Sequence, residues 1–239
     1  MRHILRNYSP NFSTKKRNLK KIKFIIIHYT GMKNESAAIK RLTNESSKVS
    51  CHYFIKTNGQ VILMVPDIYE AWHAGKSQWK KFNLLNRYSI GIEIQNSGHN
   101  HNYQNFRPVQ VKSLIKLCKN LKKKFKIKST NILGHSDIAY NRKIDPGEKF
   151  PWEKLAKKKI SIWHNIEKKK LKKLRGVSIN LKEKKFFFNN LIKFGYFHSK
   201  KNLNNKKLVA AFQRRFRNQL IDGLIDKECL KISYKIRDF

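Results

Sequence analysis

The chain has 239 residues, a length typical of one or two domains, and 40% of them are hydrophobic, which is enough for a folded core. Its mean hydropathy of −0.65 and the lack of any apolar run near ~18 residues argue against a membrane-spanning or wholly disordered protein. The 54 Lys and Arg against 15 Asp and Glu give a net charge of +39, which favours an anionic partner such as nucleic acid, anionic lipid or cell-wall polymer. Genomic base composition is an alternative source of this lysine excess.

The first two thirds of the chain alternate strand and helix patterns. We expect residues 1–20 to be a polar, loosely packed lead. Further along the chain, the Asn58-Gly59 pair indicates a β-hairpin with a type I′ turn. This alternation predicts an α/β fold with a mixed central β-sheet flanked by helices. In chain order, the expected elements are a strand at 24–27, a short helix within 34–46, hairpin strands at 53–56 and 61–65, a strand at 88–95, a helix from Pro108 to Phe125 and a strand at 131–133.

The remainder of the chain has a different pattern. We assign residues 21–167 to the α/β domain, 168–180 to a lysine-rich linker and 181–239 to a small three-helix domain. Gly195 follows an apolar aromatic run as a helix C-cap residue, and Asp226 is suited to cap the last helix. A bundle of this size is only marginally stable, so we expect it to lean on the larger domain.

Two histidines and one aspartate offer a set of metal ligands. His28 ends a predicted buried strand, His135 follows another, and Asp145 lies ten residues further on, within reach of a folded loop. A zinc hydrolase uses three such ligands and keeps a fourth position for water. Taken alone, any one histidine is more often a surface residue or a hydrogen-bonded core residue than a metal ligand.

Two further charged residues fit the same chemistry. Lys143 lies two residues before Asp145, so in an extended segment both side chains point the same way, and the ammonium group could stabilise an oxyanion. Glu93 lies on a strand among isoleucines and could take the proton of a metal-bound water. The alternative for Lys143 is a solvated surface lysine, and the alternative for Glu93 is a partnered carboxylate without a catalytic role.

Six sequence blocks occur in an order that resembles a known family. They are FIIIHYTG, VSCHYFI, AWHAGKSQW, SIGIEIQN, GHSDIA and KIDPGEKFPW. The series resembles the zinc-dependent N-acetylmuramoyl-L-alanine amidases of the type 2 amidase family, close to the AmiD-like branch, over about residues 22–165. The resemblance implies Zn²⁺ on His28, His135 and Asp145, with Glu93 and Lys143 as the catalytic pair.

The resemblance also points to substrate-binding residues. Trp72, His73 and Trp79 lie in a block that resembles a stretch near the substrate groove of the family, and Asn96 follows the strand of Glu93. We therefore expect these four to contact substrate, with core packing as the alternative for Trp72.

The C-terminal part resembles a second family. The segment AFQRRFRNQLIDGLID is similar to the core of small helical peptidoglycan-binding domains. This resemblance implies a wall-binding unit, and the alternative is a docked bundle that stabilises the enzyme.

These observations predict a bacterial amidase of peptidoglycan degradation or recycling. We expect it to hydrolyse the amide between N-acetylmuramic acid, or its anhydro form, and L-Ala of the stem peptide. The alternatives are a non-catalytic peptidoglycan-recognition module and a basic nucleic-acid-binding protein, although no motif for specific nucleic-acid binding is present.

The cysteines and the N-terminus carry an expectation about the compartment. Cys51, Cys118 and Cys229 are odd in number without a CxxC pair, which is typical of a reducing compartment. The first residues have no apolar signal core or lipid-bearing cysteine. We expect a cytoplasmic monomer without a transmembrane segment, with the envelope or periplasm as the alternative.

Overall fold

The computed structural model describes residues 4–198 and 203–239. Its central sheet has the strand order β1-β5-β4-β9-β3-β10, and β4 and β5 are the antiparallel pair among otherwise parallel neighbours. The sheet confirms the predicted mixed α/β fold. Its strands are β1 (Ile4–Arg6), β3 (Phe24–Tyr29), β4 (Tyr53–Ile55), β5 (Val61–Leu63), β9 (Ser89–Ile94) and β10 (Ile132–Gly134).

Short paired strands and helices surround this sheet. Two small antiparallel sheets pair β2 (Phe12–Ser13) with β6 (Glu70–Ala71) and β7 (Gln78–Trp79) with β8 (Phe82–Asn83). The α-helices are α1 (Glu35–Thr43), α2 (Pro108–Phe125), α3 (His135–Ile138), α4 (Trp152–Lys157), α5 (Lys168–Lys172), α6 (Leu181–Phe194), α7 (Lys206–Phe216) and α8 (Lys227–Ile236). Short 3₁₀ turns lie at Leu19–Lys21, Glu45–Ser47, Leu85–Tyr88, His99–His101 and Ser129–Asn131.

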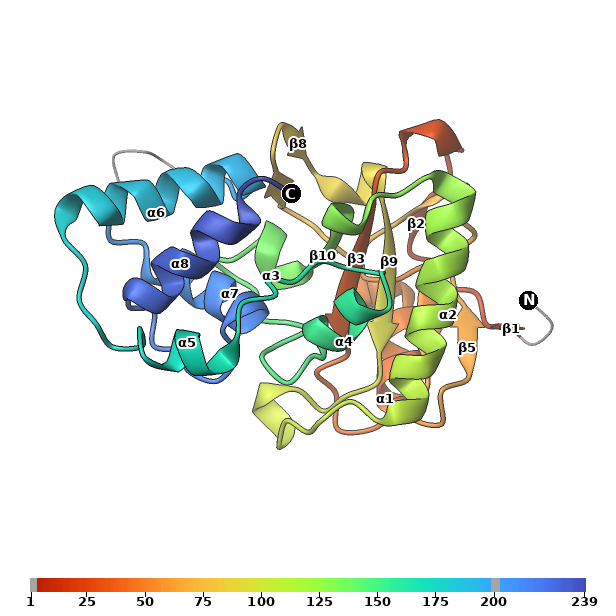
Figure 1. The fold of residues 1–239 in the computed structure, drawn as a ribbon. Coiled ribbons are helices and arrows are strands. Elements are labelled where there is room, and N and C mark those ends of the chain that lie inside the picture. The colour runs from red at the N-terminus through yellow and green to blue at the C-terminus, as the bar shows by residue number, and fades with distance from the viewer. Residues whose placement is uncertain (1–3, 199–202) are drawn as a thin grey trace.

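The two faces of the sheet are covered by different helices (Figure 1). The alternation of side chains along β3 and β9 sends one set of isoleucines toward α2, where they meet its apolar stripe. The opposite face packs against α1 at one end and against the C-terminal helices at the other. The residues of the α2 side include Ile25, Ile27, Ile90, Ile92, Val111, Leu114, Cys118 and Leu121.

The C-terminal helices α6, α7 and α8 are present as predicted (Figure 1), and their buried side chains share a core with the sheet. Phe24 and Ile26 of β3 belong to the same buried cluster as Phe187 of α6 and Phe212 of α7. Gly195 ends α6 with a φ of +147°, a conformation that favours glycine. The helical part therefore packs against the larger part through a continuous apolar core.

Two expectations for the N-terminal half are wrong. Within the described part of residues 1–20, β1 pairs with β5 as the edge of the main sheet, and the Arg17 guanidinium donates to the buried carbonyls of Asp67 and Ser89. The segment is thus an integral part of the fold. The β4–β5 hairpin is present, but Gly59 has a positive φ and Asn58 does not, so its turn is not type I′.

Among the residues that the structure describes, no helix is both long enough and apolar enough to span a bilayer.

Candidate active site

The predicted site lies where the parallel strands β3, β9 and β10 end. His28 of β3 is the register partner of Glu93 of β9, so both side chains leave the same face of the sheet. Gly134, the last residue of β10, is paired with Ile27, and the chain turns there into α3 so that His135 comes beside His28. Ligand sites commonly form at the carboxyl ends of such strands.

Three buried side chains converge at this edge. The Nδ1 atoms of His28 and His135 lie 3.0 Å apart, and Asp145 Oδ2 lies 3.1 Å from each of them. The three residues have at most 7% of their surface exposed. The structure therefore brings together the three predicted metal ligands, although they are separated by up to 117 positions in the sequence.

A chain of hydrogen bonds behind His28 fixes its tautomer. The hydroxyl of Ser89 donates to Leu85 O at 2.6 Å, so it must accept from Nε2–H of His73, which lies 3.2 Å away. Neutral His73 then accepts through Nδ1 from Nε2–H of His28 across 3.0 Å. Nδ1 of His28 is left with its lone pair facing the site.

Glycine makes room for this arrangement. A Cβ atom on Gly91 would lie 2.4 Å from Cγ of His73, far inside contact distance. The small residue of the SIGIE strand therefore allows His73 to stand directly behind His28.

His135 has the same tautomer as His28, with the proton on Nε2. Its Nε2 lies 3.3 Å from Ala74 O, an acceptor, and 3.5 Å from Arg142 Nη2, a donor that is already used by Ala74 O and Lys76 O. The closer acceptor favours the proton on Nε2 and the lone pair on Nδ1. In these tautomers two imidazole lone pairs and a carboxylate oxygen surround one point, an arrangement that a bound cation would stabilise. Tetrahedral zinc with bonds of about 2.0–2.1 Å separates its ligand atoms by about 3.3 Å, close to the observed distances, so the residues present fit a metal ion.

The pKa shifts of the two neighbouring imidazoles and of Asp145 favour the protonation states that a metal site needs. Burial lowers the pKa of His28 to about 4, and burial lowers the pKa of His73 well below its ordinary value, so both imidazoles are neutral near pH 7. Burial alone would raise the pKa of Asp145, but the contacts with His135 and His28 outweigh it and hold that pKa well below the usual range. Asp145 is therefore a carboxylate, the form that binds metal.

Glu93 and Lys143 line the same cleft, whose volume is about 550 Å³. Burial raises the pKa of Glu93 well above its ordinary value, the charge of Asp145 adds to this, and Lys143 opposes it. Glu93 Oε2 is buried without a hydrogen-bond partner among the described residues. A buried carboxyl with an unused oxygen beside a metal site is suited to accept and donate a proton.

Two of the four expected substrate-binding residues lie on the cleft. Trp72 is half-buried on its wall, and its indole Nε1–H donates to Ser13 Oγ at 3.3 Å. His73 also contributes to the wall, but both of its ring nitrogens are engaged by His28 and Ser89. Substrate contact stays a prediction for Trp72, whereas the structure gives His73 the role of supporting His28.

The structure does not place the other two expected residues on the cleft. Trp79 is fully buried and packs edge-on against Phe194 and Tyr196, so a ligand cannot reach it. Asn96 donates to Gln104 O at 2.9 Å and accepts from the backbone N–H of Gly98 at 3.0 Å, which leaves its amide occupied in shaping its own loop. Asn96 is also absent from the described lining of the cleft.

Sequence reasoning missed two residues of the site. Ser89 ends the hydrogen-bond chain behind His28, and a single serine at a strand start gives no signal of that role. Arg142 lines the cleft and is held by the carbonyls of Ala74 and Lys76, with 2.7 Å between Arg142 Nη2 and Lys76 O. Its place next to Lys143 was the available hint.

The fold and the site together indicate a class of protein: a hydrolase of α/β fold with a buried candidate metal site of two histidines and one carboxylate, and a second buried carboxyl beside it. The sequence model of the family described as N-acetylmuramoyl-L-alanine amidase matches residues 18–148. The chain belongs to this N-acetylmuramoyl-L-alanine amidase family.

Curated relatives agree with this membership. The chain is 32% identical to N-acetylmuramoyl-L-alanine amidase AmiD of Escherichia coli over 228 residues, which cover 89% of this chain and 81% of that protein. It is 40% identical over 108 residues to 1,6-anhydro-N-acetylmuramyl-L-alanine amidase AmpD of Haemophilus influenzae, covering 45% of this chain and 56% of that protein.

Solved structures extend the similarity to the whole fold. E. coli AmiD in complex with anhydro-N-acetylmuramic acid-L-Ala-D-γ-Glu-L-Lys has a TM-score of 0.79 at 29% identity, covering 95% of this chain and 91% of that chain. AmpDh3 of Pseudomonas aeruginosa in complex with an anhydromuramic pentapeptide has a TM-score of 0.79 at 27% identity, covering 100% and 98%. The predicted family, fold and amidase activity in cell-wall turnover or recycling are confirmed.

Proposed function

We propose that the metal is Zn²⁺ and that His28, His135 and Asp145 hold it during hydrolysis of the amide between N-acetylmuramic acid and L-Ala. The observation that carries this proposal is the convergence of two imidazole nitrogens and one carboxylate oxygen within 3.1 Å of one another. Two imidazoles and one carboxylate are a standard catalytic set for zinc, and they leave a position for water. Zinc bound there would supply a water acidified to a pKa of about 7 and a positive charge near the scissile carbonyl.

The chain itself supplies the proton transfer and the anion stabilisation. Glu93 accepts the proton of the attacking water and returns it to the leaving amine of L-Ala, because this residue lines the cleft, has an oxygen without a partner among the described residues and has a raised pKa. Lys143 provides a positive charge for the oxygen that becomes negative as water adds to the carbonyl. The chain behind His28 keeps that imidazole in the tautomer that binds metal.

The cleft also suits an anionic substrate. Besides Lys143, Arg41 and Arg142 line it, and stem peptides carry carboxylates that these cations would attract. The AmiD and AmpDh3 structures are complexes with anhydromuramyl peptides, and we propose the same chemical class of substrate for this protein.

The experiment is mass spectrometry of the products formed from polymeric wall and from an anhydromuramyl peptide, side by side, with zinc-loaded and chelator-treated protein. We expect release of the free stem peptide from the anhydromuramyl substrate in the presence of zinc. Zinc binding without hydrolysis of either substrate would instead indicate a recognition module. The cytoplasmic location stays a prediction, which cell fractionation tests.

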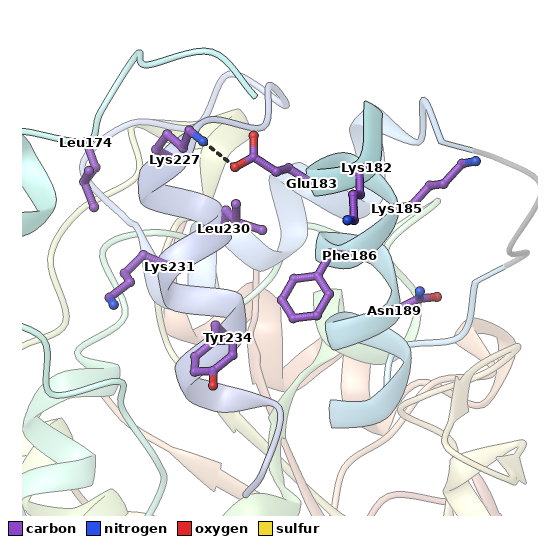
Figure 2. Close-up of a pocket in the computed structure, with 10 residues that line it drawn as sticks. All are labelled: Leu174, Lys182, Glu183, Lys185, Phe186, Asn189, Lys227, Leu230, Lys231 and Tyr234. Atoms are coloured by element: carbon purple, nitrogen blue, oxygen red, sulfur yellow. Dashed lines mark hydrogen bonds and ion pairs between the residues drawn. The ribbon is translucent and has the colours of Figure 1, made fainter. Parts of the chain in front are cut away.

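The helical part contains a groove that is suited to a second binding site, separate from the cleft of the candidate active site (Figure 2). It lies between α6 and α8, has a volume of about 800 Å³, and exposes the rings of Phe186 and Tyr234 by 40% and 49%. The two rings stack with centroids 6.1 Å apart. Four lysines and one glutamate are its charged lining: Lys182, Lys185, Lys227, Lys231 and Glu183, the last paired with Lys227.

We propose that this groove binds the wall polymer, with aromatic faces against sugar rings and lysines near stem-peptide carboxylates. Sedimentation with insoluble peptidoglycan, in chelator-treated protein to prevent cleavage, tests it. Phe186→Ala combined with Tyr234→Ala should lower the bound fraction several-fold, whereas Tyr8→Ala, which removes an equally exposed ring elsewhere, should not. Equal binding by the double variant and the parent would contradict the proposal.

A further inference from the structure

The turn that carries His135 is held by a buried carboxylate, Asp137. Its Oδ2 accepts the backbone N–H of Gly134 at 2.7 Å and so closes the passage from β10 into α3. In the same turn, the N–H of Ser136 donates to Asp145 O at 2.8 Å. The turn therefore fixes the backbone of two of the three metal ligands at once.

The other partners of Asp137 come from the C-terminal helical part. The hydroxyl of Tyr196, the second residue after α6, donates to Asp137 Oδ1 at 2.6 Å. Arg215 of α7 donates through Nη1 to Asp137 Oδ2 and through Nη2 to Ile132 O of β10, the latter at 2.9 Å. Asp137 and Arg215 are 1% and 2% exposed, so this ion pair is buried between the two parts of the chain.

Aromatic packing holds Arg215 in this place. Its guanidinium lies 4.3 Å from the ring centroid of Trp152 at the start of α4, and that tryptophan would be 3.3 Å from a Cβ atom on Gly134. The guanidinium, Trp152 and the β10–α3 turn thus form one packed unit behind His135.

We propose that Arg215 and Tyr196 are positioning residues of the metal site, and that the helical part is a structural component of the amidase centre. Loss of Arg215 would leave Asp137 as a buried charge without its cation, which is costly. The carboxylate would have to move toward other partners, and the turn that aims His135 would move with it. This inference rests on the proposed metal site.

The test compares two arginines of the same helix end in the full-length protein. Arg215→Met removes the pair with Asp137, whereas Arg217→Met removes an equally buried arginine that pairs with Asp222 and Asp226 inside the helical part. Zn²⁺ affinity is measured by competition with a chromophoric chelator, and ligand geometry by the visible d–d spectrum of the Co²⁺-loaded protein.

We expect both variants to lower the melting temperature, but only Arg215→Met to weaken Zn²⁺ binding, by about 10-fold or more, and to change the Co²⁺ spectrum. Tyr196→Phe removes one hydroxyl with little loss of packing and should weaken Zn²⁺ binding in the same direction, which keeps the test valid if Arg215→Met does not fold. Unchanged Zn²⁺ affinity and Co²⁺ spectrum in the folded variants, or equal losses in Arg217→Met, would overturn the inference. Failure of the parent protein to bind Zn²⁺ would instead overturn the proposed metal site.

Discussion

His28 donates its Nε2–H to Nδ1 of His73 across 3.0 Å, and this single contact decides which nitrogen of His28 faces the site. Since His73 is itself polarised by Ser89 and the carbonyl of Leu85, the tautomer of a metal ligand is set by a backbone acceptor three contacts away. Metal affinity should therefore depend on side chains that never touch the metal.

Ser89→Ala tests this dependence. Without the hydroxyl, Nε2–H of His73 loses its acceptor and the tautomer of His28 is no longer fixed, so Zn²⁺ affinity should fall about 10-fold. Isothermal titration of chelator-treated protein with Zn²⁺ measures it. Ser233→Ala, which removes a buried serine hydroxyl in α8, is the control and should bind Zn²⁺ like the parent. Equal affinities for the parent and Ser89→Ala would refute the role of the chain.

Glu93→Gln should remove activity while raising stability. The pKa of Glu93 is raised because its charged form is buried, so the neutral amide relieves that cost in the metal-free protein near pH 7. We expect kcat to fall by about 10²–10⁴-fold with Zn²⁺ content retained. Glu70→Gln, at a half-buried glutamate outside the cleft whose pKa burial also raises, should keep full kcat. A Glu93→Gln protein that turns over normally would exclude Glu93 as the general base.

Lys143→Ala should separate binding from catalysis. If Lys143 stabilises the developing oxyanion, its removal lowers kcat by about 10²–10³-fold and leaves Zn²⁺ content unchanged. Lys154→Ala, on the exposed side of α4, is the control for loss of one positive charge. An effect on KM alone would assign Lys143 to substrate binding.

Acid should destabilise the metal-free protein in a defined window. Burial lowers the pKa of His28 and of His164 to about 4 from an unfolded value near 6.5, so the unfolded state binds protons first as the pH falls. The two neutral histidines contribute fully to the free energy of unfolding above about pH 6.5, and this contribution is lost as the pH falls to about 4. Between these values the free energy of unfolding changes by up to about 1.4 kcal/mol per pH unit for each histidine. Urea unfolding at pH 7, 5.5 and 4.5 measures it, and His164→Gln should reduce the slope. A free energy of unfolding that is constant or rises on acidification would contradict this.

The central strands and the metal ligands could be predicted from the sequence because they rest on local patterns and ordered motifs. The apolar run of β3 and the alternation of β9 fix the face on which His28 and Glu93 lie. The motif GHSDIA places His135 at the start of a turn, and the loop to Asp145 is short enough to fold back.

The errors arise where distant parts of the chain pack together. Trp79 is typical of a groove residue in its motif, but the end of α6 covers it, and no local signal reports that contact. The edge strand Ile4–Arg6 has only three residues, too few for a periodic pattern, and it forms because β5 offers it a partner. The roles of Ser89 and Arg215 likewise depend on residues that lie beside them in space and far from them in the sequence.

The most direct test of the central claim is a titration of chelator-treated protein with Zn²⁺ while hydrolysis of an anhydromuramyl peptide is followed. We expect activity to rise in proportion to added zinc and to level off at about one ion per chain, whereas Asp145→Ala binds little zinc and stays inactive. Full activity of the metal-free Asp145→Ala protein would contradict the claim that these three side chains hold the ion on which catalysis depends.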